Sequence, residues 1–133
     1  MTIDPQAATG LQHSLELGGG PILDPDTLEA LRELGGEDDP ELLTELIDLF
    51  VDDAGRRVQG IMASLSRGDV EAVARAAHAL KSAAANLGAF GFSGACRELE
   101  TTARQGAAIQ EPAQRVTRMF PEVQSALARL QER

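Results

Sequence analysis

Two residues with reactive side chains stand three positions apart in an otherwise plain stretch, VARAAHALKSAAANLGA, at positions 73–89. They are His78 and Lys81, and Lys81 is the only lysine among the twelve basic residues of the chain. Residues three apart are neighbours on a helix surface. The small side chains around them would leave the imidazole open to a bulky partner. The pattern indicates an accessible histidine with a compact cation beside it.

An exposed neutral imidazole is a nucleophile that can take up a phosphoryl group. The ordinary pKa of histidine, about 6.5, leaves much of the ring neutral near pH 7. A lysine one helical turn away can hydrogen-bond the phosphoryl oxygens. We therefore interpret His78 as a phosphoryl acceptor and Lys81 as its charge partner.

Other uses of the histidine fit the sequence less well. A general base needs a pocket, which an exposed helix face does not provide, and no nucleophile nearby suggests a catalytic triad. A di-metal site in a helical bundle needs Glu-x-x-His pairs. The chain has only His13 and His78, and neither follows a glutamate by three. We predict no metal site, no cofactor and no autonomous catalytic site, and we interpret His13 as a solvated tail residue.

Composition limits the environment and the partners of the chain. The net charge of −9 argues against nucleic-acid binding, which requires clustered lysine and arginine. With Cys96 alone, no intramolecular disulfide is possible, and we interpret this cysteine as a small core residue. No signal sequence and no membrane span is recognisable. We expect a cytoplasmic protein that is not attached to a membrane.

Apolar spacing of three and four residues predicts helices and no strand of any length. Asp24 and Pro25 are typical of a helix start, as are Asp39 and Pro40, whereas glycine clusters mark the ends. Pro121 lies inside the last helical segment but points away from its apolar stripe. This predicts a single helix that is kinked at the proline. The expected helices span about 24–35, 39–67, 69–87, 90–104 and 112–130.

Short connections between long amphipathic helices favour antiparallel neighbours. We therefore predict an all-α fold, an antiparallel up-down-up-down four-helix bundle with a short additional N-terminal helix. Residues 1–20, which end in three glycines, are expected to form a flexible leader, and residues 21–133 the bundle domain. Four helices suffice to close a core, so we expect a monomer.

The helix of residues 69–87 has its apolar stripe on one side and His78 on another. At 100° per residue, His78 lies about 120° from the middle of the stripe formed by Val73, Leu80 and Leu87. Arg75, Ser82 and Ala85 share its side, and we expect Ala74 to add to the small residues around the ring. His78 is therefore predicted to be exposed on the outer face of this helix.

The segment AHALKSAAANLGA resembles the signature of histidine-containing phosphotransfer (HPt) domains of two-component phosphorelays. The matching residues are His78, Leu80, Lys81, Ser82, Asn86, Leu87, Gly88 and Ala89. The resemblance extends from about Leu23 to Leu130 and includes LLTELIDLFVDDA before the motif and CRELETTAR after it.

The resemblance implies a phosphocarrier on which a receiver domain docks. The phosphoryl group would move between a receiver aspartate and His78, Lys81 would stabilise it, and Mg²⁺ would be bound by the receiver. Ser82 takes a position often held by glycine, and Gly88 ends the helix. The phosphoryl-access and docking surface is expected to comprise Ser82, Ala74, Ala85, Arg75 and Gly88. Leu28 and Leu31 are interpreted mainly as core.

Our leading hypothesis is a free-standing carrier between response-regulator receiver domains, supplied by a sensor histidine kinase of hybrid type. An HPt domain excised from a hybrid or chemotaxis-type kinase is an alternative, as is a dimerising kinase helix pair. A second class is a helical-bundle adaptor that binds a receiver or kinase without being phosphorylated. An enzyme with an internal active site fits least.

Overall fold

Five helices and a small strand pair make up the part of the chain that the computed structural model describes, residues 16–17 and 20–131. The leader residue His13 lies outside this part. The helices are α3 (Pro25–Gly35), α4 (Leu42–Arg67), α5 (Val70–Asn86), α6 (Phe90–Arg104) and α7 (Gln110–Gln131).

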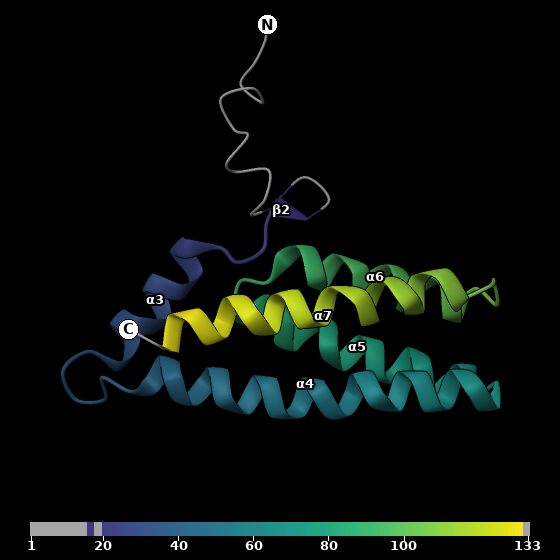
Figure 1. Ribbon diagram of the computed structural model, residues 1–133, viewed down its shortest axis with the longest axis horizontal. Coiled ribbons are helices and arrows are strands. Elements are labelled where there is room, and N and C mark those ends of the chain that lie inside the picture. Colours follow the sequence, from purple (N-terminus) through teal and green to yellow (C-terminus); the bar gives the residue numbers. More distant parts are fainter. Residues whose placement is uncertain (1–15, 18–19, 132–133) are drawn as a thin grey trace, which may run out of the picture.

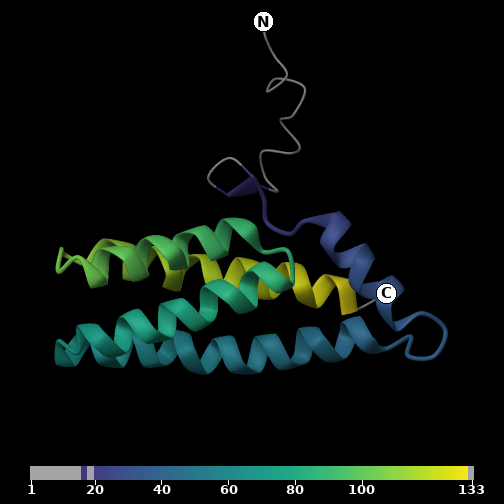
Figure 2. The ribbon, with the colours of Figure 1, turned by 180° about the vertical axis from the view of Figure 1, so that it is seen from behind.

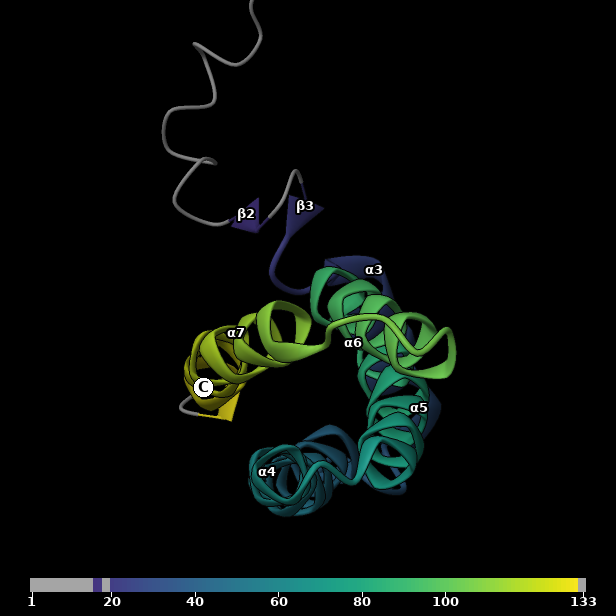
Figure 3. The ribbon, with the colours of Figure 1, turned by 90° about the vertical axis from the view of Figure 1, so that its right-hand side faces the viewer.

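The four long helices form a closed ring around one core. α4 packs on α5, α5 on α6, α6 on α7, and α7 back on α4 (Figure 3). Successive helices run in opposite directions, and the shorter α3 packs against α4 at one end of the bundle (Figures 1 and 2). The predicted up-down-up-down bundle with an additional N-terminal helix is confirmed.

Two helices begin where the sequence predicts, after Asp24 and near Asp69, and a third begins later than predicted. Asp24 caps α3 by accepting from the backbone N–H of Thr27 at 3.0 Å, and Asp69 caps α5. The predicted start at Asp39 and Pro40 is wrong, because α4 begins at Leu42 and has no side-chain cap. Instead, the backbone carbonyl of Asp39 accepts a hydrogen bond from the backbone N–H of Leu42, in the turn that precedes α4.

α7 runs as one helix through Pro121, as the continuous apolar stripe predicted. Pro121 is exposed, and it lacks the backbone N–H that would otherwise donate to the carbonyl four residues earlier. The helix begins at Gln110, two residues before the expected start. None of the described helices is both long and apolar enough to cross a membrane.

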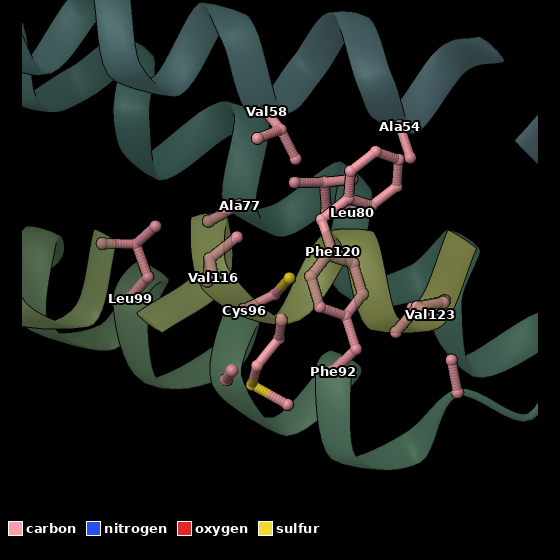
Figure 4. Close-up of a cluster of buried hydrophobic side chains, with 14 of the residues drawn as sticks. Ala54, Val58, Ala77, Leu80, Phe92, Cys96, Leu99, Val116, Phe120 and Val123 are labelled. Atoms are coloured by element: carbon pink, nitrogen blue, oxygen red, sulfur yellow. The ribbon is translucent and has the colours of Figure 1, made fainter. Parts of the chain in front are cut away.

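The core is aliphatic, with one aromatic pair at its centre. Phe92 of α6 and Phe120 of α7 lie with ring centroids 6.0 Å apart (Figure 4). Cys96 is fully buried among these side chains, and burial raises the pKa of its thiol to about 12. Because the thiolate is the reactive form, this cysteine is a core residue, as predicted.

One short element was not expected from the sequence. Two strands, β2 (Glu16–Leu17) and β3 (Gly20–Pro21), pair in antiparallel fashion just before α3. A ladder of two residues per strand is too short to show the alternation that identifies a strand in a sequence.

Candidate functional site

His78 lies on the outward face of α5, as the helical spacing predicted. Its side chain is 59% exposed, whereas Ala77 and Leu80 beside it are fully buried. The alternation arises because α5 packs on both α4 and α6 and leaves one side free. The imidazole is therefore accessible to a second protein.

The sequence reasoning missed the residue that holds the histidine in place, Glu100 of α6. Its Oε2 lies 3.0 Å from Nδ1 of His78, and its Oε1 accepts from Nζ of Lys81 at 2.9 Å. The same Oε2 accepts from Nε of Arg104, one turn along α6, at 3.0 Å. The one sequence feature that could have identified Glu100 is its position at the edge of the apolar stripe of α6, next to the buried Leu99.

α6 is fixed against α5 close to this carboxylate. Ser93 is buried, and its hydroxyl donates to the backbone carbonyl of Lys81 at 2.8 Å. This bond fixes the register of the two helices, and Glu100 follows two helical turns later on the same side of α6. The helix contact thus delivers a carboxylate to the histidine from 22 residues away.

Glu100 is ionised throughout the physiological range. The hydrogen bond from Lys81 lowers its pKa most; burial opposes this, and the contacts with Arg104 and His78 lower it further. The resulting pKa is about 2, against an ordinary value of 4.5. Because an ionised carboxylate can only accept hydrogen bonds, Nδ1 of a neutral His78 must carry the proton. Nε2 then bears the free lone pair.

The lowered pKa of Glu100 makes the stability of the fold acid-sensitive. The ionised group contributes fully above pH 4.5, its ordinary pKa, and the contribution falls as the pH drops toward 2. We therefore expect Glu100→Gln to be less stable than the parent at pH 7 by about 1–3 kcal/mol, and the difference to shrink by pH 3. Urea unfolding at both pH values measures this.

Other carboxylates titrate in the same range, so the difference between parent and variant is the relevant quantity. Glu98→Gln is a matched control on α6, because Glu98 is 54% exposed and, among the residues that the structure describes, pairs only with Arg115. It should cost little at either pH. A Glu100→Gln difference that is the same at pH 7 and pH 3 would contradict the expectation.

Lys81 is brought next to His78, but its ammonium group faces the carboxylate. Its side chain is 27% exposed and pairs with Glu100. The predicted cation is therefore present one helical turn from the imidazole, and part of its side chain is exposed to solvent. Lysine has a flexible stem and a point-like charge, so the ammonium can turn toward a group attached to Nε2.

Of the five residues predicted to form the surface around the histidine, two are exposed, one is half-buried and two are buried, so the expected exposure is wrong for the last two. Arg75 and Ser82 are exposed, and Ala85 is half-buried. Ala74 is only 1% exposed. The buried arc of α5 is wider than its apolar stripe, because α6 covers a second side of the helix.

Gly88 is also buried and supports the fold rather than a contact surface. Its φ of 78° lies in the left-handed region, and a Cβ there would come within 3.0 Å of Thr27 Cβ. Its carbonyl accepts from the backbone N–H of Asp24 at 2.9 Å. Gly88 thus ends α5, as predicted, and joins that end to the start of α3.

An apolar groove opens beside the C-terminal half of α5. It has a volume of about 300 Å³ and lies between α3, α4 and α5. Leu49 is 68% exposed there, whereas Leu28 is buried in the core as predicted. The lining residues are Leu31, Leu46, Leu49, Phe50, Asp53, Ala83, Asn86 and Leu87.

The described residues contain no group of three or more His, Cys, Asp or Glu side chains that could hold a metal ion. The cluster at His78 has a single carboxylate and two cations. Two positive groups next to one carboxylate suit an incoming anion rather than a metal cation.

Comparison with known proteins points to one family. The model of the Hpt domain family matches residues 45–133. The crystal structure of histidine-containing phosphotransfer protein B from Pseudomonas aeruginosa PAO1 is similar, with 32% identity and a TM-score of 0.76 over 84% of this chain and 96% of that chain. A putative histidine-containing phosphotransfer protein from rice shares the fold at 20% identity, with a TM-score of 0.58 over 95% and 94%. A search of curated proteins found no significant match.

Proposed function

Because the chain belongs to the Hpt domain family and is a histidine phosphotransfer protein of phosphorelays, we propose that His78 is its phosphorylation site. The observation that carries the proposal is the contact between Nδ1 and the ionised Glu100. This contact presents Nε2 with a lone pair on an exposed helix face. The chain itself acts as a carrier and not as an enzyme.

The proposed reaction is a reversible transfer between two proteins. Nε2 of neutral His78 attacks the phosphorus of an aspartyl phosphate on a receiver domain. The P–O bond breaks, and the aspartate leaves as a carboxylate. The proton on Nδ1 stays in place, so the phosphorylated ring is positive and Glu100 stabilises it. In the reverse direction a neutral imidazole leaves, which makes the phosphoryl group readily transferable.

The experiment that tests this function is transfer from a radiolabelled, phosphorylated receiver to the purified chain. The label should move to the chain and form a bond that is labile in acid and stable in alkali, as expected of phosphohistidine. The donor receiver is expected to belong to a hybrid-type sensor kinase in the cytoplasm and to bring the Mg²⁺. The proposal would be refuted if the chain accepted label from none of the receivers of the source organism.

The receiver docks, in this proposal, on a surface that joins His78 to the apolar groove. Ser82 and Ala83 follow His78 on α5 and lead to the groove, where Leu49 stands exposed. A receiver would cover these residues when it places its aspartate on Nε2. Asp53 also lines the groove, and the chain carries a net charge of −9. The fitting partner surface is therefore an apolar patch with basic residues at its rim.

Lys81→Ala is expected to shorten the lifetime of phosphohistidine or slow its formation by about threefold to tenfold. One charge-assisted contact to the phosphoryl oxygens is lost, and 1.4 kcal/mol corresponds to a factor of ten. The measurement is the decay of label from the isolated phosphoprotein and the rate of transfer. Circular dichroism should show an intact bundle, because Lys81 is partly exposed.

Lys81→Arg is the matched variant, since it keeps the charge but not the compact ammonium. It should recover part of the lost rate. Kinetics of Lys81→Ala identical to those of the parent would remove the proposed role of this lysine.

A further inference from the structure

The two carboxylate oxygens of Glu100 accept hydrogen bonds from different cations. Oε1 accepts only from Lys81 of α5, at 2.9 Å, among the described residues. Oε2 accepts from Nε of Arg104, at 3.0 Å, and also faces Nδ1 of His78. Arg104 therefore acts on the oxygen that orients the histidine, and Lys81 acts on the other one.

Phosphorylation of His78 would add negative charge that competes with Glu100 for these cations. A phosphoryl group on Nε2 of His78 places up to two negative charges one helical turn from Lys81. The ammonium is then drawn away from Oε1 toward the new oxygens. Without another cation, Glu100 would lose its main partner at the moment when the ring it supports becomes positive.

Arg104 is placed to prevent this loss. It lies one turn beyond Glu100 on the same helix, so its contact does not depend on α5. A guanidinium is charged at every accessible pH. The site also carries one more cation than anion before phosphorylation, and this excess offsets part of the incoming negative charge.

We propose that Arg104 is a positioning residue that keeps Glu100 ionised and hydrogen-bonded to Nδ1 of His78 after Lys81 has turned to the phosphoryl group. The inference rests on the proposed function. Under this inference the two cations have separate roles: Lys81 stabilises the phosphoryl oxygens, and Arg104 maintains the orientation of the imidazole ring.

The alternative is an ordinary ion pair within one helix, in which the half-exposed Arg104 merely lies four residues from Glu100. The two readings predict opposite signs for one measurable quantity, the proton affinity of Nδ1 in the phosphorylated ring. If Arg104 acted only by its charge, its removal would raise this affinity, because a nearby cation disfavours a positive ring. If Arg104 positions Glu100, its removal lowers the affinity, because the carboxylate is lost from Nδ1.

The experiment uses the full chain, phosphorylated with phosphoramidate so that no partner protein is needed. The titration of Nδ1 is followed by ¹⁵N NMR of the phosphohistidine. Arg104→Gln is expected to lower the proton affinity of Nδ1 about tenfold, which corresponds to one unit on the pH scale. In the unphosphorylated variant, Lys81 still holds Glu100, so the Nδ1–H tautomer should persist.

Two variants serve as controls. Arg97→Gln removes the same charge from an exposed position of α6 that pairs with no described residue. In this variant, Nδ1 of the phosphohistidine should titrate as it does in the parent. Arg104→Lys restores a cation near Oε2 and should recover most of the affinity. Both controls separate contact with Glu100 from a general effect of charge.

A raised or unchanged affinity in Arg104→Gln would overturn the inference. So would loss of the Nδ1–H tautomer before phosphorylation, because Arg104 would then be needed at all times. If the parent chain forms no phosphohistidine, the proposed function fails instead, and this result is visible before any variant is compared.

Discussion

His78→Gln is expected to abolish phosphoryl transfer to this chain. Glutamine keeps a polar side chain of similar reach, but its amide nitrogen is not a nucleophile. The side chain is 59% exposed, so the substitution should leave the core and the bundle intact. The measurement is label transferred from a phosphorylated receiver, with thermal unfolding recorded in parallel.

The chain contains one other histidine, and it provides the matched control. His13→Gln should accept label like the parent, because His13 lies in the N-terminal segment and has no predicted partner. Acid-labile label that persists in His78→Gln would show that another residue is phosphorylated. The assignment of His78 would then be withdrawn.

Leu49→Asp is expected to reduce transfer from a receiver by about tenfold or more, through lost docking. Leu49 is 68% exposed at the apolar groove, and a carboxylate there would be buried against the apolar patch of the receiver. A factor of ten corresponds to 1.4 kcal/mol, which is within the range of a central interface residue. The measured quantity is kcat/KM for transfer between the two proteins.

Docking and chemistry are separated by the choice of phosphoryl donor. Phosphoramidate needs no protein interface, so Leu49→Asp should react with it at the rate of the parent. Met62→Asp adds the same charge to α4 on the side that contacts Thr117 of α7, and it should transfer normally. Equal transfer by Leu49→Asp and the parent would exclude the groove from the docking surface.

The five helices could be predicted because each carries its own pattern. The stripe of α7 continues in phase across Pro121, so a helix was the correct prediction despite the proline. Asp24 and Asp69 are capping residues, and a cap acts within three residues along the chain. The start of α4 was missed because Asp39 lies in a turn after α3, where its carbonyl and not its side chain is used.

The outward position of His78 was likewise a matter of local spacing. One hundred degrees per residue places it off the apolar stripe, whichever helices complete the bundle. Ala74 was misplaced because the width of a buried arc depends on how many helices cover it. α5 is covered by α4 and by α6, and a single stripe cannot show the second contact.

The sequence by itself determined the parts of this protein that arise within one helix: the five helices of the described residues, most of their ends, the exposed histidine and the lysine one turn from it. Only the tertiary structure decided what the histidine contacts. Glu100 is a single glutamate at the edge of a stripe until α6 packs on α5 and brings its carboxylate to Nδ1. The physical reason is range, because helical spacing acts over three or four residues, whereas this hydrogen bond joins residues 22 positions apart.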